Sequence, residues 1–336
     1  MDRSNPLRLA VLGAGRMGRR HIAAAARAKG VVLAAVCDPV PGAAAAAAPA
    51  GTATAAGLGE LGRPVDAVVI AAPTPFHTGL AEAALGMGLD VLCEKPVGFD
   101  ADAIERLGEL AARAGRVLAV GFWRRTAWPY SEARRLLDEG AIGVPAHIRA
   151  AQWDAELPPL AFADPAVSGG IEVDCGVHEV DLARWFLGAE IAQVSATGTP
   201  GTLSEVGDAE TVAALAATTA GQSVTIDLGR TCGYDDDVRT EILGSEGALL
   251  IDARGSGGLR LGTRDGLREV PGPGGDVREL ALAAQLERFA EACAGGEPHA
   301  TAADAARALE VCQAMRRSRL AGGRVELLTP PHATTS

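Results

Sequence analysis

Lysine is nearly absent from this sequence. Of its 31 basic residues, only Lys29 and Lys95 are lysines, and the rest are arginines. A lysine can release its proton where an arginine cannot, so a chain this biased toward arginine is expected to keep lysine where arginine does not serve. Lys95 lies in Glu94-Lys95-Pro96, directly after the apolar run at 91–93, where a strand would end beside a ligand. We therefore expect Lys95 to be functional; the alternative is a surface ion pair with Glu94.

Long apolar runs, paired cysteines and basic clusters are also lacking. The first apolar run, residues 7–12, is too short for a signal peptide and leads into glycines, and no run is long enough to span a bilayer. The six cysteines contain no Cys-x-x-Cys pair, which favours reduced thiols over disulfides or a zinc site. The net charge of -11 argues against nucleic acid or an anionic membrane as a partner. We expect a cytoplasmic globular protein.

The N-terminal residues carry a dinucleotide-binding fingerprint. A buried strand at 7–12 leads into Gly13-Ala14-Gly15-Arg16-Met17-Gly18, a helix follows to about residue 28, and a second strand at 31–37 ends at Asp38. The glycines permit a tight turn, approach of the backbone to a pyrophosphate and close helix–strand packing. Asp38 would accept hydrogen bonds from the ribose and repel a 2′-phosphate, which favours NAD over NADP. The alternative for Asp38 is a turn cap ahead of Pro39.

Two further strands and a helix complete a predicted first domain, residues 1–122 of the 336, with a doubly wound parallel sheet. The strands cover 65–72 and 116–122, and the helix covers about 100–114. In the loop at 73–77, Thr74 is expected to cap the next helix, and His77 to be structural. The predicted cofactor-binding residues are Gly13, Gly15, Arg16, Met17, Gly18, Asp38, Pro73, Thr74, Glu94 and Lys95.

Aromatic residues, only 4% of the chain, gather at the start of a predicted second domain, residues 123–328. Its pattern favours an α+β domain with an antiparallel sheet. The predicted strands cover 146–153, 210–218, 222–230, 238–243 and 248–251, with a short one near Val325. Helices are predicted to about residue 137 and over 277–294 and 302–320, the last of which could pack back on the first domain. Residues 329–336 are expected to form a disordered tail.

Asp174 and His178 form a second group with chemical potential. They are four residues apart, so on one helix they would share a face. A carboxylate beside an imidazole can raise its basicity and fix its orientation, as a general base requires. The alternative is a solvated ion pair beside a core face. A metal site is disfavoured, because His178-Glu179 is followed by Leu182 where a His-Glu-x-x-His motif needs its second histidine.

Together these motifs resemble the Gfo/Idh/MocA oxidoreductases, and within them the inositol 2-dehydrogenases. The resemblance covers nearly the whole chain. It implies a catalytic group of Lys95, Asp174 and His178, and an open second sheet that builds homodimers or homotetramers. Further stretches carry the likeness: Gly121 to Arg125, Ser168-Gly169-Gly170, His178 to Arg184, and Gly233-Tyr234-Asp235 to Gly247. Two segments differ from the usual pattern of the inositol 2-dehydrogenases: Thr126-Ala127-Trp128 and Gln152-Trp153-Asp154. Both lie where the resemblance implies that the substrate is recognised.

We interpret the chain as an NAD-dependent dehydrogenase that oxidises a secondary hydroxyl of a cyclic polyol or pyranose. His178 would accept the hydroxyl proton. The residues predicted to line the substrate are Trp123, Arg124, Trp153, Asp154, Asp174, His178 and Tyr234. Three alternatives stay open: a keto-sugar reductase, a nucleotide-binding regulator without catalysis, and a glycosidase that uses tightly bound NAD.

Overall fold

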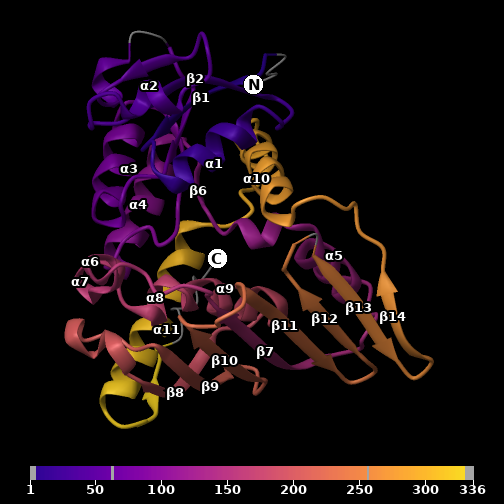
Figure 1. The fold of residues 1–336 in the computed structure, drawn as a ribbon. Helices are drawn as coiled ribbons and strands as arrows, with labels where there is room; N and C mark the ends of the chain where they lie inside the picture. Colours follow the sequence, from indigo (N-terminus) through magenta and orange to yellow (C-terminus); the bar gives the residue numbers. More distant parts are fainter. Residues whose placement is uncertain (1–4, 62–63, 256, 330–336) are drawn as a thin grey trace. The chain divides into compact units, whose positions relative to one another are not determined.

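The described chain divides into two units, each of which is treated by itself. A computed structural model describes residues 5–61, 64–255 and 257–329. The first unit comprises Met1–Ala127 with Arg278–Ala306, and the second comprises Trp128–Val277 with Arg307–Ser336 (Figure 1). From residue 330 onward, the predicted tail lies outside the described residues.

The first unit is built on a parallel sheet of six strands in the order β3-β2-β1-β4-β5-β6. The order reverses between β1 and β4, as in a doubly wound dinucleotide-binding fold. Every residue of β4 is buried, as expected of a central strand covered on both faces. The strands are β1 (Leu7–Leu12), β2 (Val31–Cys37), β3 (Ala53–Ala55), β4 (Ala67–Ile70), β5 (Asp90–Cys93) and β6 (Leu118–Val120). The predicted fold class is confirmed.

Helices flank this sheet. The α-helices are α1 (Arg16–Ala25), α2 (Ala43–Ala47), α3 (His77–Gly86), α4 (Ala101–Ala114) and α10 (Val277–Cys293), and the 3-10 turns are η1 (Leu58–Glu60), η2 (Thr74–Phe76) and η3 (Trp123–Thr126). In α4, the Asp100 carboxylate accepts a hydrogen bond from Ala103 N–H at 3.3 Å. Ile104, Leu107 and Ala111 form its buried face. The helix therefore has both a cap and an apolar stripe.

The helix α10 comes late in the sequence but lies beside α1 (Figure 1). The Lys29 N–H donates to a Glu287 carboxylate oxygen at 2.8 Å, and the Val120 N–H donates to the Ala300 carbonyl at 3.1 Å. Because of such contacts, Arg278–Ala306 groups with the first unit, whereas the sequence boundary had placed this segment in the second domain.

One local prediction, that Thr74 caps α3, is wrong. Thr74 begins η2 instead, α3 begins at His77, and neither element has a side-chain cap. The intervening 3-10 turn separates the Thr74 hydroxyl from the start of α3. The His77 ring lies between two carbonyl oxygens, those of Ala72 at 2.6 Å and Pro96 at 2.8 Å. His77 thus holds together the loops after β4 and β5, which fits its predicted structural role.

The second unit contains a mixed, mostly antiparallel sheet of nine strands in the order β14-β13-β12-β11-β7-β10-β9-β8-β15. Only the β7–β10 pairing is parallel among its described strands. The strands are β7 (Pro145–Trp153), β8 (Ile191–Thr199), β9 (Thr211–Thr218), β10 (Ser223–Gly229), β11 (Asp237–Gly244), β12 (Ala248–Asp252), β13 (Gly258–Thr263), β14 (Gly266–Val270) and β15 (Glu326–Leu327). The sequence interpretation missed β8, β13 and β14.

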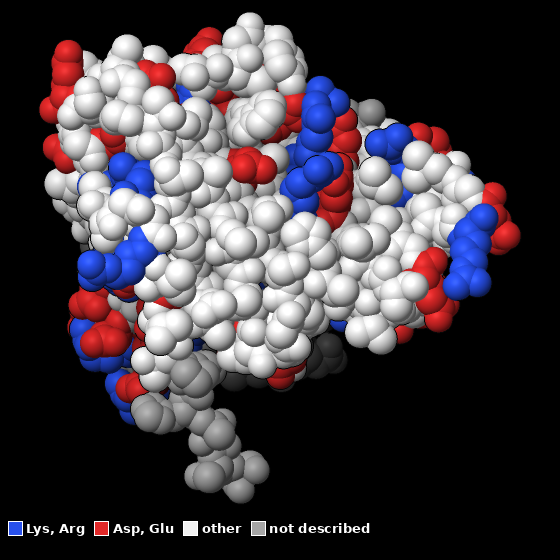
Figure 2. All heavy atoms as spheres, turned by 90° about the horizontal axis from the view of Figure 1, so that it is seen from below, with Lys and Arg blue, Asp and Glu red and all other residues white. Residues whose placement is uncertain are grey.

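Helices pack on one face of this second sheet. The α-helices are α5 (Trp128–Asp138), α6 (Leu160–Ala163), α7 (Pro165–Ser168), α8 (Ile171–Asp174), α9 (Gly176–Leu187) and α11 (Ala302–Leu320), and a 3-10 turn is η4 (Gly201–Val206). The helix α9 lies against β7 and β10, and its side chains are buried on nearly every side. In β9, the exposed Thr211, Ala213 and Leu215 alternate with buried neighbours, so the other face of the sheet stays open. Figure 2 shows a broad uncharged surface bordered by charged residues.

In the described part of the chain, no helix is both long and apolar enough to cross a membrane.

Candidate active site

The glycine turn after β1 has the geometry of a phosphate-binding loop. Gly13 has φ +104°, and a Cβ there would lie 2.6 Å from the Ala71 carbonyl oxygen. A Cβ on Gly18 would lie 1.8 Å from the Gly13 carbonyl oxygen, so these two glycines are required by the protein's own packing. A Cβ on Gly15 would meet nothing within 4 Å. The packing of the protein leaves this space open, as close approach of a pyrophosphate requires.

The first turn of α1 completes this loop. Arg16 begins the helix, Gly15 is its N-cap, and the turn contains neither a side-chain cap nor an acidic residue. The N–H groups of Arg16, Met17 and Gly18 belong to the first turn of α1, where an α-helix has no internal acceptor for them. Such a turn favours an anion. The residues present therefore fit a dinucleotide.

Asp38 follows β2 and supports the same loop. One carboxylate oxygen accepts a hydrogen bond from the Ala14 N–H at 2.7 Å, and the other accepts from the Val40 N–H at 2.9 Å. The bond to Val40 is the turn cap that the sequence left as an alternative. Each carboxylate oxygen can accept more than one hydrogen bond, so these contacts fix the orientation of Asp38 without exhausting its capacity to bind ribose hydroxyls.

The Glu94-Lys95-Pro96 segment emerges directly after β5, and the Lys95–Pro96 peptide bond is cis. Glu94 is only 5% exposed. Its Oε1 lies 2.6 Å from His21 Nε2, and its Oε2 accepts from the Lys95 N–H at 3.2 Å. A buried carboxylate bonded to a buried imidazole does not fit the surface ion pair considered above. His21, on α1, was not found by sequence reasoning.

Other predicted residues of the first unit lie at the ends of its strands or just after them. Pro73 and Thr74 follow β4. Trp123 and Arg124 belong to η3 and are buried. The guanidinium carbons of Arg124 and Arg278 lie 5.8 Å and 5.4 Å from the Trp123 ring centroid, within the range of cation–π attraction. Trp123 is thus packed against two cations.

In the second unit, Asp174 and His178 lie on two consecutive helices and not within one. Asp174 ends α8, whereas His178 lies in α9, and Cys175 separates the two helices. A Cβ on Gly176 would lie 3.1 Å from a Leu228 methyl group, so this glycine lets the start of α9 approach β10 closely. His178 is buried, and Asp174 retains 21% side-chain exposure.

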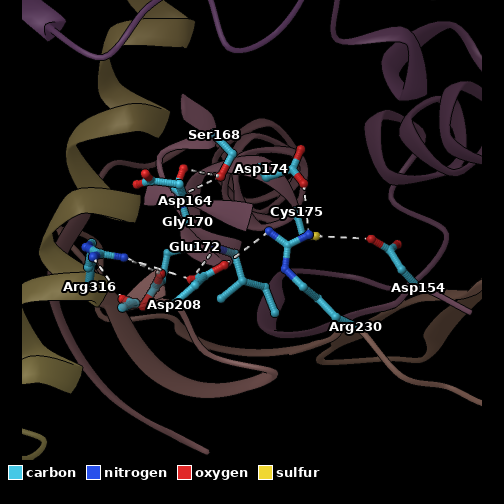
Figure 3. A network of polar contacts seen from close by, with 12 residues as sticks. Asp154, Asp164, Ser168, Gly170, Glu172, Asp174, Cys175, Asp208, Arg230 and Arg316 are labelled. Atoms are coloured by element: carbon cyan, nitrogen blue, oxygen red, sulfur yellow. Dashed lines mark hydrogen bonds and ion pairs between the residues drawn. The ribbon is translucent and has the colours of Figure 1, made fainter. Parts of the chain in front are cut away.

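A buried arginine holds Asp174. Arg230 follows β10 and is 1% exposed. Its Nη1 donates to Asp174 Oδ2 at 3.1 Å, and its Nη2 lies 3.5 Å from Asp208 Oδ2 (Figure 3). Asp208 Oδ1 accepts from the Ile171 N–H at 3.1 Å. Sequence reasoning missed Arg230 and Asp208, which carried no motif.

Asp154, just past β7, is held from two sides. Its Oδ1 accepts from Gln152 Nε2 at 2.9 Å, and its Oδ2 accepts from Cys175 Sγ at 3.3 Å (Figure 3). Trp153 is exposed. The Tyr234 ring is exposed too, and the hydrogen bond from its hydroxyl to Asp237 raises the pKa of Tyr234 to about 12. Over the described residues, no group of three or more His, Cys, Asp or Glu side chains could hold a metal ion.

Comparison with known proteins agrees with this geometry. Residues 7–122 match a model described as an oxidoreductase family with an NAD-binding Rossmann fold, which defines the class of the protein as an NAD-dependent oxidoreductase. Residues 130–250 match the GFO/IDH/MocA C-terminal domain. The chain belongs to the GFO/IDH/MocA oxidoreductase family, and the predicted family and NAD cofactor are confirmed.

Three similar proteins illustrate the family. The rhizopine catabolism protein MocA of Rhizobium meliloti is 34% identical over 312 residues, covering 91% of this chain and 93% of the relative. An inositol 2-dehydrogenase of Rhizobium meliloti is 32% identical over 270 residues, covering 79% and 81%. The crystal structure of a scyllo-inositol dehydrogenase from Lactobacillus casei, with bound NAD(H) and scyllo-inositol, has a TM-score of 0.82 and 27% identity, covering 96% and 99%.

Proposed function

We propose that this protein oxidises a secondary hydroxyl of a cyclic polyol or pyranose, of inositol type, with NAD as the hydride acceptor. The observation that carries the proposal is the pairing of Asp174 with buried Arg230 just before the helix of His178, in a chain that also has an NAD-binding loop. The inositol 2-dehydrogenase relative, similar over 79% of this chain, supports the same substrate class.

Each catalytic residue has a proposed role. His178 accepts the proton of the substrate hydroxyl, and Asp174 orients the imidazole for this step. Lys95 stabilises the negative charge that develops on the substrate oxygen as the C=O bond forms. When bound, NAD would supply the acceptor for the hydride of the carbinol carbon; with the proton accepted by His178, one C–H and one O–H bond would be exchanged for the carbonyl.

Substrate recognition is proposed for Trp123, Arg124, Trp153, Asp154 and Tyr234. Asp154 is the strongest candidate for selecting the substrate. Its two hydrogen bonds fix the orientation of a carboxylate that can accept from vicinal hydroxyls. Exposed Trp153 and Tyr234 offer rings suited to the apolar C–H face of a cyclic polyol.

We also propose that the protein is a cytoplasmic homodimer or homotetramer. The open face of the second sheet, where Thr211, Ala213 and Leu215 are exposed on β9 and Arg149 pairs with Glu241, supports self-association. Free cysteines, with no disulfide among the described residues, fit a reducing compartment. Sedimentation at several protein concentrations tests the oligomer; a monomer throughout would refute it.

A substrate panel tests the proposed function. Inositols, aldoses and keto-sugars are each assayed with NAD or NADH, and cofactor absorbance is followed. We expect NADH to form with at least one cyclic polyol or pyranose, and this activity to be lost in His178→Asn. Turnover confined to keto-sugars with NADH would favour the reductase instead, and no turnover with any compound would favour the regulator.

A further inference from the structure

We infer that Arg230 is a positioning residue for the reaction, because together with Asp208 it fixes both ends of α8, the short helix that ends at Asp174. The inference rests on the proposed function, in which Asp174 orients the general base. Arg230 and Asp208 lie outside the predicted catalytic group, on segments that flank β10 and β9.

The first end of α8 is held by Asp208. This helix has four residues, too few to be stable through its own hydrogen bonds. Its first residue, Ile171, donates its N–H to Asp208 Oδ1 at 3.1 Å. The preceding Gly170 has φ +80°, and a Cβ there would lie 2.6 Å from Arg316 Nη1. The chain therefore enters α8 through a positive-φ position, in which any L side chain would be strained.

The other end of α8 is held by Arg230. The planar guanidinium directs Nη1 toward Asp174 and Nη2 toward Asp208 at once (Figure 3). Arg230 and Asp208 are buried, whereas Asp174 keeps 21% side-chain exposure. Arg230 thus links the buried Asp208 carboxylate, which accepts from the start of α8, to the partly exposed Asp174 carboxylate at the end of α8.

Further charged side chains surround the Asp208 carboxylate. Arg316 Nη1 lies 3.9 Å from Asp208 Oδ1 and 3.9 Å from Glu172 Oε2. Arg319 Nε donates to Glu172 Oε1 at 2.6 Å. Buried charges need such compensation. The network therefore balances Asp208 without requiring Arg230 to turn away from Asp174.

Lysine cannot replace this arginine. An ammonium is a single point charge on a flexible stem, whereas the guanidinium presents two donors in fixed directions. With Arg230→Lys, one of the two carboxylates loses its contact with residue 230, and we expect Asp174 to shift. Displacement of an orienting group by about 1 Å can reduce turnover roughly 100-fold. We expect kcat to fall by about 10- to 100-fold, with KM for NAD changed less than about 2-fold.

A double-mutant cycle separates this role from a merely structural one. The variants are Arg230→Lys, Asp174→Asn and the double mutant, and kcat is measured on the best substrate. If Arg230 acts through Asp174, Arg230→Lys will cost less than about 3-fold in the Asp174→Asn background. Arg184→Lys is the matched control: Arg184 is also buried and forms a bidentate pair, with Glu190 at 2.7 and 2.8 Å. It should keep kcat near the wild-type value.

The outcomes separate the role of Arg230 from the proposed role of Asp174. Equal fold-losses from Arg230→Lys in both backgrounds, or a near-normal kcat in the single variant, would overturn the role of Arg230 alone. A near-normal kcat in Asp174→Asn would overturn the proposed role of Asp174 and this inference with it. Should Arg230→Lys fail to fold, Asp208→Asn supplies the same cycle, because it loosens Arg230 while its amide oxygen can still accept from Ile171.

Discussion

His21 Nε2 lies 2.6 Å from Glu94 Oε1, with both side chains buried. This bond joins α1, the helix of the phosphate-binding turn, to the residue directly before Lys95. Two parts of the first unit with proposed roles, one toward the cofactor and one toward the substrate oxygen, therefore share a buried polar contact.

Replacing His21 tests the strength of this contact. His21→Leu leaves the Glu94 carboxylate buried without its imidazole partner, and we expect the free energy of unfolding to fall by about 2–4 kcal/mol. Denaturant unfolding measures the change. Arg27→Ala is the control, because the Arg27–Glu279 pair is exposed and such pairs contribute about 1 kcal/mol or less. Equal losses in the two variants would contradict a special role for the buried bond.

Asp38 should set the cofactor preference. We expect the wild type to use NAD far better than NADP, and Asp38→Asn to reduce the NAD/NADP ratio of kcat/KM by roughly 10-fold or more, because it removes a charge that repels the 2′-phosphate. An asparagine oxygen can still accept from Ala14, so the turn should be preserved. A ratio unchanged by the substitution would show that Asp38 serves only the turn.

Lys95→Arg tests whether Lys95 works at the reacting oxygen. The substitution keeps the charge but replaces a compact ammonium with a planar fork. We expect most of kcat to be lost, while NAD affinity and Tm stay close to wild type. Near-normal kcat on the best substrate would show that arginine can replace Lys95 and would contradict its role at the reacting oxygen.

His299 should make stability depend on pH in the acid range. Burial, helped by the charge of Arg125, lowers the pKa of His299 to about 4 from 6.5, and its Nδ1 is buried. As pH falls from 6.5 toward 4, the unfolded chain binds a proton that the folded chain excludes, so stability is lost over this window, by up to about 3 kcal/mol. The free energy of unfolding, measured at several pH values, should fall less steeply between pH 6.5 and 4 in His299→Gln than in the wild type. The same dependence on pH in both proteins would contradict the role of His299.

The sequence predicted those strands and helices whose boundaries are specified by short, contiguous stretches of residues. The strands Leu7–Leu12 and Val31–Cys37 and the helix Ala302–Leu320 were predicted with the boundaries observed, because apolar periodicity and flanking turn residues specify them. The strands Gly258–Thr263 and Gly266–Val270 were missed, because glycine and arginine interrupt their alternation.

The residues of the candidate active site could be predicted only where they belong to a sequence motif. The glycine turn and Asp38 could be identified from spacing, but His21 and Glu94 are 73 residues apart, and Arg230 and Asp174 are 56 apart. No local pattern pairs residues at such distances. The division into two helices at Cys175 was not predicted either, because the residue at that position is neither a glycine, a proline nor a typical cap residue.

Deuterium transfer tests the central claim most directly. The protein is incubated with NAD and an inositol labelled with deuterium at its carbinol carbons, and the nicotinamide product is examined by mass spectrometry. The account predicts NADH carrying one deuterium, together with one keto-inositol per NADH. Bound NAD that stays oxidised and unlabelled, with the same result for labelled pyranoses, would contradict it.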